Sequence, residues 1–226
     1  MTYPYEVLAE SPLFANIASN EVGAMLECLQ ATQKSFEKGD FILRPGEAVE
    51  NVGMVLSGHA TVMREDYWGN RELLTTIGPG NLFAEVFACI PQSRANVSVV
   101  AGDGCTVMLL NIARILTTCS SSCAFHARLV ENLVRVLAQK NLLMNEKLGH
   151  LSRRSTREKL LSYLSAEAQR QGKSRFSIPF NRQQLADYLS VDRSAMSAEL
   201  SRMRKDGLVD YSRSYFELKE TEDVSH

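Results

Sequence analysis

Hydrophobic and polar positions alternate differently in successive regions of the chain. In residues 34–110, short apolar runs are separated at close intervals by glycine and proline; examples are Val52–Leu56, Ala60–Arg64, Leu73–Ile77 and Val97–Ala101. Short strands with frequent turn signals predict an antiparallel sheet that is closed or double-layered, an arrangement that leaves few strand edges exposed. The spacing of apolar residues within residues 6–30 predicts a helix in front of this sheet.

The next region, residues 112–148, contains neither glycine nor proline and is predicted to be helical, with a break near residues 119–123. Apolar residues recur there at steps of three and four: Leu129, Leu133, Val136, Leu137, Leu143, Met144, Leu148 and Leu151. This stripe is typical of an amphipathic helix. It allows two arrangements, because the helix can cover its own sheet or pair with the same helix of a second subunit.

The polar run at residues 152–155 predicts a hinge, and the segment after it has the pattern of two short helices joined by a tight turn. Asn181 and Gln184 have the spacing of a capping box, while Asp192 can cap a second helix that ends at Gly207. A helix over residues 156–168 and a strand over 176–180 are expected before them, and a hairpin over 208–218 after them. Together these elements predict a winged helix-turn-helix domain.

The second of these helices has two opposed faces. Met196, Leu200 and Met203 fall on one side, and the small residues Ser194, Ser197, Ala198 and Ser201 on the other. A small face can approach the floor of the major groove of DNA, and Arg193 at its start is placed to donate two hydrogen bonds to guanine. We expect further contacts, mainly with phosphate, from Arg182 and Gln183 in the first helix, Arg202 in the second, and Arg213 at the hairpin tip.

The distribution of charge agrees with this interpretation. Residues 1–150 carry 11 Lys and Arg against 15 Asp and Glu, whereas residues 151–219 carry 14 against 8. A basic second part favours a polyanionic partner such as double-stranded DNA. The five cysteines lack the spacing of a disulfide framework, and neither a secretion signal nor a membrane-spanning run is visible, so we expect a cytoplasmic protein with reduced thiols and no membrane partner.

Two other classes of protein compete with a DNA-binding regulator. A glycine-rich barrel also suits a cupin metalloenzyme, but such an enzyme needs several histidines and carboxylates inside the barrel, and the sheet region holds only His59. We therefore expect no enzyme activity. A regulatory domain that has lost DNA binding is disfavoured by Arg193 and the serine face, and salt-dependent binding to mixed DNA distinguishes these classes.

Several short motifs, taken in their order and spacing, resemble the Crp–Fnr family (cyclic-AMP receptor protein and its relatives) over nearly the whole chain. They are Gly39-Asp40, Pro45-Gly46-Glu47, Leu56-Ser57-Gly58, Gly69, Gly80 and Phe83-Ala84-Glu85 in the front half, and Arg182–Ala186 and Val191–Ser194 in the back half. The resemblance implies an α+β fold with a cyclic-nucleotide-binding-like β-roll (a double-stranded jelly roll) over residues 1–111. A long dimerisation helix over 112–150 and a winged helix-turn-helix over 151–226 would follow. It also implies an effector-controlled homodimer that binds a near-palindromic operator, with RNA polymerase as a further partner.

The resemblance places the candidate effector pocket at Ala84, Glu85, Ala95, Asn96, Met144 and Asn145. In nucleotide-binding members the pocket has a Gly-Glu pair and an Arg-Ser pair, and here only Glu85 is retained. Arg94 lies one residue too early, and on a strand that offset points its side chain to the other face. The residues that would read the base fall on Met144 and Asn145. Cyclic AMP is therefore not the expected effector, and the sequence names no other.

Cofactors are not expected either. The resemblance implies no iron–sulfur cluster, because Cys28 stands alone near the N-terminus, and no haem, because Val86 and Phe87 follow Glu85 where a histidine would be needed. Cys119 and Cys123 beside His126 are placed to bind metal or respond to an oxidant. We favour instead that these cysteines are small buried apolar residues at a helix junction.

Overall fold

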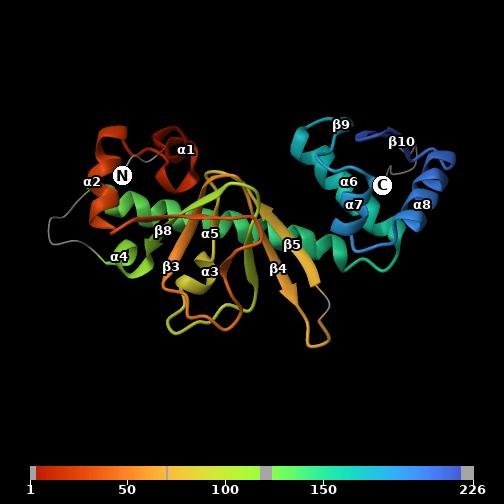
Figure 1. Cartoon of the computed structure of the whole chain (residues 1–226). Coiled ribbons are helices and arrows are strands. Elements are labelled where there is room, and N and C mark those ends of the chain that lie inside the picture. Colours follow the sequence, from red (N-terminus) through yellow and green to blue (C-terminus); the bar gives the residue numbers. More distant parts are fainter. Residues whose placement is uncertain (1–3, 70, 118–123, 220–226) are drawn as a thin grey trace. The chain divides into compact units, whose positions relative to one another are not determined.

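The structure is a computed structural model that describes residues 4–69, 71–117 and 124–219. The chain forms two compact units, one up to residue 139 and one from residue 140 onward. Each unit has its own hydrophobic core, and helix α5 (Ala124–Leu151) contributes to both units (Figure 1). No helix within the described residues combines the length and apolar character needed to cross a bilayer.

The first unit contains two four-stranded sheets in which every pair of strands is antiparallel. The strands are β1 (Thr32–Phe36), β2 (Phe41–Leu43), β3 (Asn51–Ser57), β4 (Ala60–Glu65), β5 (Arg71–Ile77), β6 (Leu82–Phe83), β7 (Ser98–Ala101) and β8 (Cys105–Asn111). Their order is β1-β8-β3-β6 in one sheet and β2-β7-β4-β5 in the other. The predicted double-layered antiparallel fold is confirmed, and the four predicted strand segments correspond to β3, β4, β5 and β7.

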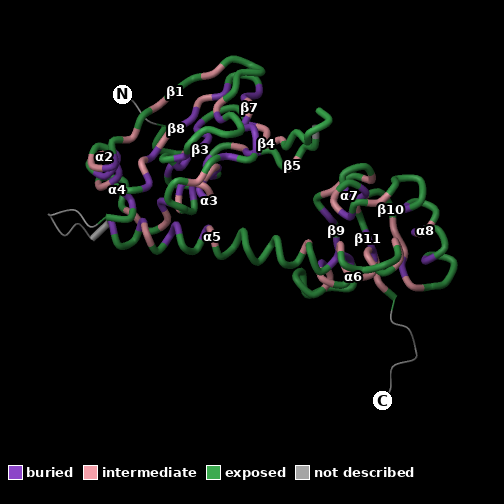
Figure 2. The backbone as a smooth tube through the Cα atoms, turned by 90° about the horizontal axis from the view of Figure 1, so that it is seen from below, coloured by how far each residue is buried: buried purple, intermediate pink, exposed green. Residues whose placement is uncertain are grey.

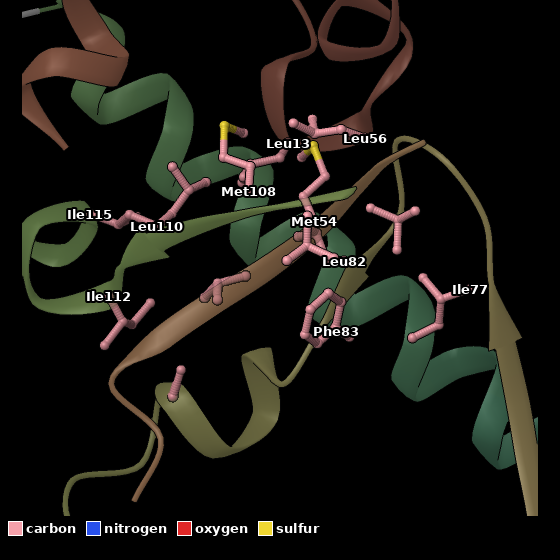
Figure 3. Close-up of a cluster of buried hydrophobic side chains, with 14 of the residues drawn as sticks. Leu13, Met54, Leu56, Ile77, Leu82, Phe83, Met108, Leu110, Ile112 and Ile115 are labelled. Carbon is pink, nitrogen blue, oxygen red and sulfur yellow. The ribbon is translucent and has the colours of Figure 1, made fainter. Parts of the chain in front are cut away.

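Short helices surround these sheets: α1 (Tyr5–Glu10), a 3-10 turn η1 (Pro12–Phe14), α2 (Ser19–Cys28), α3 (Glu85–Ala88) and α4 (Ile112–Leu116). The core contains Met54 from β3, Met108 from β8 and Phe83 from β6, all buried (Figure 3). The ring of Phe83 lies over Gly53, where an added Cβ would stand 2.1 Å from Cζ of the ring. Any other residue at this point of β3 would therefore force the Phe83 ring to move.

The first part of α5 packs on the first unit. Leu129, Leu133 and Val136 are buried in its core. The buried side-chain amide of Asn132 donates hydrogen bonds of 2.9 and 2.8 Å to the carbonyl oxygens of Leu13 and Ala15. Of the two arrangements that the apolar stripe allowed, packing on its own sheet unit is thus confirmed for this part. Figure 2 shows the later part of the helix mainly exposed. Five large apolar residues of α5 are more than half exposed: Val134, Leu142, Leu143, Met144 and Leu148.

The second unit has the predicted order of helices and hairpin. Its elements are α6 (Thr156–Gln171), β9 (Arg175–Ser177), α7 (Arg182–Tyr188), α8 (Arg193–Lys205), β10 (Val209–Ser212) and β11 (Tyr215–Leu218). The strands form one antiparallel sheet in the order β10-β11-β9. β9 is shorter than predicted because its pairing with β11 ends at Ser177. The winged helix-turn-helix is therefore present, with the β10–β11 hairpin as the wing.

Candidate nucleic-acid interface

Local capping fixes where the two helices of the motif begin. Asn181 Oδ1 accepts a 2.9 Å hydrogen bond from the Gln184 backbone N–H, and Gln184 Oε1 accepts one of 2.9 Å from the Asn181 backbone. Asp192 Oδ1 accepts from the Ala195 N–H at 2.8 Å and from the Ser194 hydroxyl. The Ser194 hydroxyl and the Ala195 N–H lower the pKa of Asp192, because both stabilise its ionised form. Both predicted caps are confirmed, and they place residues 182 and 193 in the first turns of α7 and α8.

The two faces of α8 are separated as predicted. Met196, Leu200 and Met203 are buried, whereas Ser194, Ser197 and Ser201 are exposed. The hydroxyl of Ser197 donates to the Arg193 carbonyl at 2.9 Å, and that of Ser201 to the Ser197 carbonyl at 3.0 Å. Each of these two protons is therefore held by the helix, and the lone pairs of the hydroxyl oxygens are left as acceptors. This surface is small enough to approach base edges in a groove.

Four of the predicted contact residues line a single concavity of about 550 Å³: Arg193, Arg182, Gln183 and Arg213. Asn181 and Ser214 complete its lining. The four come from the start of α8, the start of α7 and the turn of the wing, where Arg213 adopts a left-handed backbone conformation with φ of 52°. Tertiary structure thus brings together three arginines that are up to 31 positions apart in the sequence.

The arginines of the second unit fall into two groups according to their partners. Several form ion pairs, including Arg202 with Glu199 at 2.8 Å and Arg204 with Asp210 at 2.6 Å. By contrast, none of Arg182, Arg193 and Arg213 pairs with a carboxylate among the described residues. The concavity therefore carries uncompensated positive charge, which favours an anionic ligand. Arg202, also predicted to contact DNA, lies outside this concavity and is ion-paired with Glu199, which is also 3.6 Å from Arg157.

Arg182 has a second set of contacts that the sequence did not predict. Its guanidinium carbon lies 4.7 Å from the centre of the Tyr211 ring and 4.9 Å from that of Phe216. Burial lowers the pKa of Arg182, although an arginine remains charged in any protein environment. A sequence signal that could have indicated this contact is Tyr211, an aromatic residue close to the tip of the predicted hairpin.

The candidate effector residues of the first unit lie around α3 and the segment before β7. Glu85 is 3% exposed, and the preceding Ala84 has a left-handed backbone with φ of 62°. Ala95 is buried, whereas Arg94 is exposed and donates a 2.6 Å hydrogen bond to the Gly46 carbonyl. The buried position thus carries a methyl group and no cation. These residues do not fit a cyclic phosphate, because its negative charge would be buried without a partner.

Other predicted positions are placed as follows. Asn96 is exposed in the first unit, and Met144 and Asn145 are exposed on the part of α5 that belongs to the second unit. Cys119 and Cys123 lie outside the described residues, and His126 is buried. Within the part of the chain that the structure describes, no three His, Cys, Asp or Glu side chains are grouped as metal ligands.

Comparisons with known proteins agree with this architecture. Residues 33–122 match the family model of the cyclic nucleotide-binding domain, and residues 158–223 match that of the Crp-like helix-turn-helix domain. A CRP-like cAMP-activated global transcriptional regulator of Mycobacterium tuberculosis is 25% identical over 146 residues, which cover 65% of this chain and 62% of the relative's own length. The cyclic AMP receptor protein of Thermus thermophilus is 25% identical over 213 residues, 93% of each chain.

Among solved structures, the c-di-GMP-responsive global regulator CLP of Xanthomonas campestris has a TM-score of 0.58 at 17% identity, covering 90% of this chain and 100% of that one. At this identity the likeness concerns the fold alone. The two domain models and the observed sheets define the class, a cyclic nucleotide-binding-like β-roll followed in the chain by a Crp-like winged helix-turn-helix domain. The chain belongs to the Crp–Fnr family, since both domain models match it in the family's order and its relatives are regulators of that type.

Proposed function

We propose that the chain acts as a homodimer that binds a near-palindromic DNA operator under the control of an effector in the first unit. Each subunit would insert α8 into a major groove, and the two grooves would lie about 34 Å apart on the operator. Arg193 would read a guanine, while Arg182, Gln183 and Arg213 would hold the phosphate backbone on either side of the groove.

One observation carries the DNA-binding part of this proposal. Three arginines without acidic partners among the described residues, from α7, α8 and the wing, surround one concavity beside the small face of α8. In a two-helix pair that binds no ligand this cluster of arginines would be unfavourable, because like charges close together repel. A phosphate backbone would neutralise these charges and release its own counterions.

The dimer is supported by the exposed stripe on α5. Val134, Asn141, Met144 and Leu148 follow one another at steps of seven, three and four, which is the spacing of a coiled-coil seam. The three apolar members are 59%, 64% and 55% exposed in the single chain. A second copy of the same helix would cover them.

The effector stays unidentified, and cyclic AMP is not proposed because Ala95 supplies no cation for its phosphate. A ligand at the buried Glu85 would act by shifting the population of DNA-binding and non-binding conformations. RNA polymerase is proposed as the partner through which a bound dimer changes transcription.

Binding to DNA is tested with a mixed-sequence duplex, by fluorescence anisotropy at several salt concentrations. We expect the affinity to fall steeply with salt, in proportion to the number of phosphates contacted. Arg213→Ala should weaken binding and make the salt dependence shallower. Arg175→Ala is the matched control, because Arg175 is also exposed, on β9 of the same sheet, but pairs with Glu217 at 2.9 Å. The proposal is wrong if the wild-type chain shows no salt-dependent binding.

A further inference from the structure

Tyr211, on strand β10 of the wing, contacts both helices of the motif. The guanidinium carbons of Arg182 on α7 and Arg204 on α8 lie 4.7 and 4.0 Å from the centre of its ring. Its hydroxyl oxygen is 3.3 Å from Oγ of Ser201 on the exposed face of α8. A single side chain therefore connects the wing to both helices that are proposed to meet DNA.

The two arginines at this ring differ in their remaining partners. Arg204 is ion-paired with Asp210 at 2.6 Å and also donates to the Tyr211 carbonyl. Arg182 has no carboxylate partner among the described residues, and its Nη1 is buried without a hydrogen-bond acceptor there. Tyr211 and Phe216 thus supply its main contacts within the protein, through their ring faces. Since Arg182 also lines the concavity, its charge is held there without being neutralised.

We propose that Tyr211 is a positioning residue of the DNA interface, which holds the Arg182 guanidinium ready to bind a backbone phosphate beside Arg193 and Arg213. The proposal rests on the proposed DNA binding of the second unit. A free arginine side chain loses rotamer freedom when it binds a ligand. A guanidinium already stacked on an aromatic ring loses less, so more of the energy of the phosphate contact is available for affinity.

Tyr211 also packs on Phe216, with 6.0 Å between ring centres, so its removal has a structural effect that must be separated from positioning. Two substitutions distinguish the structural effect from the positioning of Arg182. Tyr211→Phe keeps the ring and removes only the hydroxyl that meets Ser201, while Tyr211→Leu removes the stacking surface. Tyr215→Leu serves as the control on the same hairpin, because the Tyr215 ring has no stacked guanidinium within the described part of the chain.

The experiment measures the affinity of the full chain for a mixed-sequence duplex over a series of salt concentrations. Tyr211→Leu should lower the affinity by about tenfold, the usual effect of removing one charge-assisted hydrogen bond. It should also make the slope of log affinity against log salt shallower by about 0.9 for each phosphate that the variant no longer neutralises. Tyr211→Phe and Tyr215→Leu should bind like the wild type. Circular dichroism and thermal melting check the fold, and Tyr211→Met replaces Tyr211→Leu if the latter unfolds.

A double-mutant cycle with Arg182→Ala decides whether Tyr211 acts through Arg182. If it does, the variant with both substitutions binds DNA as weakly as Arg182→Ala alone. Additive losses, an unchanged salt slope in Tyr211→Leu, or a loss in Tyr211→Phe equal to that in Tyr211→Leu would overturn the inference. Absence of DNA binding by the wild type would instead overturn the proposed function.

Discussion

Arg202 and Glu199, three residues apart on α8, form an ion pair of 2.8 Å. Arg193 at the start of the same helix pairs with no carboxylate among the described residues. To contact DNA, Arg202 would have to exchange Glu199 for a phosphate, whereas Arg193 has no ion pair among the described residues to break. Two arginines on one helix therefore differ in their readiness to bind an anion, and this difference can be measured.

Replacing Arg193 with Ala should lower the affinity for the specific operator by about 1–3 kcal/mol, the usual value of a bidentate arginine–guanine contact. Binding to mixed-sequence DNA should change little, and Arg202→Ala should have the smaller effect on operator affinity. Competition binding with an operator selected from a random library gives the two affinities. An equal loss on both duplexes would show that Arg193 contacts the backbone and does not read a base.

Replacing Met144 with Glu should convert the dimer into a monomer, because the exposed apolar stripe of α5 would then carry a charge at its seam. Analytical ultracentrifugation at micromolar concentration measures the mass. Gln139→Glu introduces the same charge at an exposed position of α5 outside the seam and should leave the dimer intact. A monomeric wild type, or dissociation by Gln139→Glu as well, would contradict the proposed interface.

The second unit should lose stability as the pH falls through about 6.5, the usual pKa of histidine. His150 is buried, with Nδ1 at 2.8 Å from Ser162 Oγ and Nε2 at 3.9 Å from Glu146 Oε1. Burial lowers its pKa; Glu146 and Glu167 oppose this shift and Arg153 adds to it. The unfolded chain therefore takes up a proton at a higher pH than the folded one, and stability is full above that pH and declines below it.

Hydrogen exchange of the α6 amides, measured between about pH 8 and pH 5 after correction for intrinsic rates, reports this loss of stability. His150→Gln, which keeps a polar group near Ser162 without titrating, should flatten the pH dependence. If the variant retains the full dependence, another group is responsible.

Gly53→Ala should destabilise the first unit, since its Cβ would lie 2.1 Å from Cζ of Phe83. Overpacking of this kind costs about 1–3 kcal/mol and appears as a lower thermal midpoint. Gly149→Ala on α5 is the control, because its methyl group would meet no atom of the described residues within 4 Å apart from its chain neighbours and the nearby helix backbone, and alanine favours helix. A Gly53→Ala variant as stable as the wild type would mean that the Phe83 ring can move aside at little cost.

Cyclic AMP at millimolar concentration should neither bind measurably in calorimetry nor raise the thermal midpoint. The reason is the methyl group of the buried Ala95, which cannot pair with a phosphate, while the exposed Arg94 is bonded to the Gly46 carbonyl. Saturable binding that is weakened by Glu85→Gln would contradict this prediction and make the first unit a nucleotide sensor.

The parts of the fold that follow from local interactions were predictable from sequence. Asn181 with Gln184, and Asp192 with Ala195, cap their helices through bonds that span three residues, so the helix starts are visible in the sequence itself. The strands β3, β4, β5 and β7 were located for a similar reason, because turns on both sides delimit them. The sequence could not show which part of α5 packs on the first unit and which part is exposed. Burial of Leu133 and exposure of Met144 depend on which surface each residue faces.

For the candidate interface, sequence alone determined the identity of the arginines, the opposed faces of α8 and the hairpin that carries Arg213. The Arg202–Glu199 pair, three residues apart on α8, is likewise visible in the sequence. Only the tertiary structure decided that Asp210 reaches Arg204, because the wing packs on α8, and that Arg182, Arg193 and Arg213 have no acidic partner among the described residues. It likewise placed Tyr211 against Arg182, 29 positions away in the chain. Pairing of charges and stacking of rings are set by distances in space, and a linear pattern records those distances only within a turn of helix or across a tight hairpin.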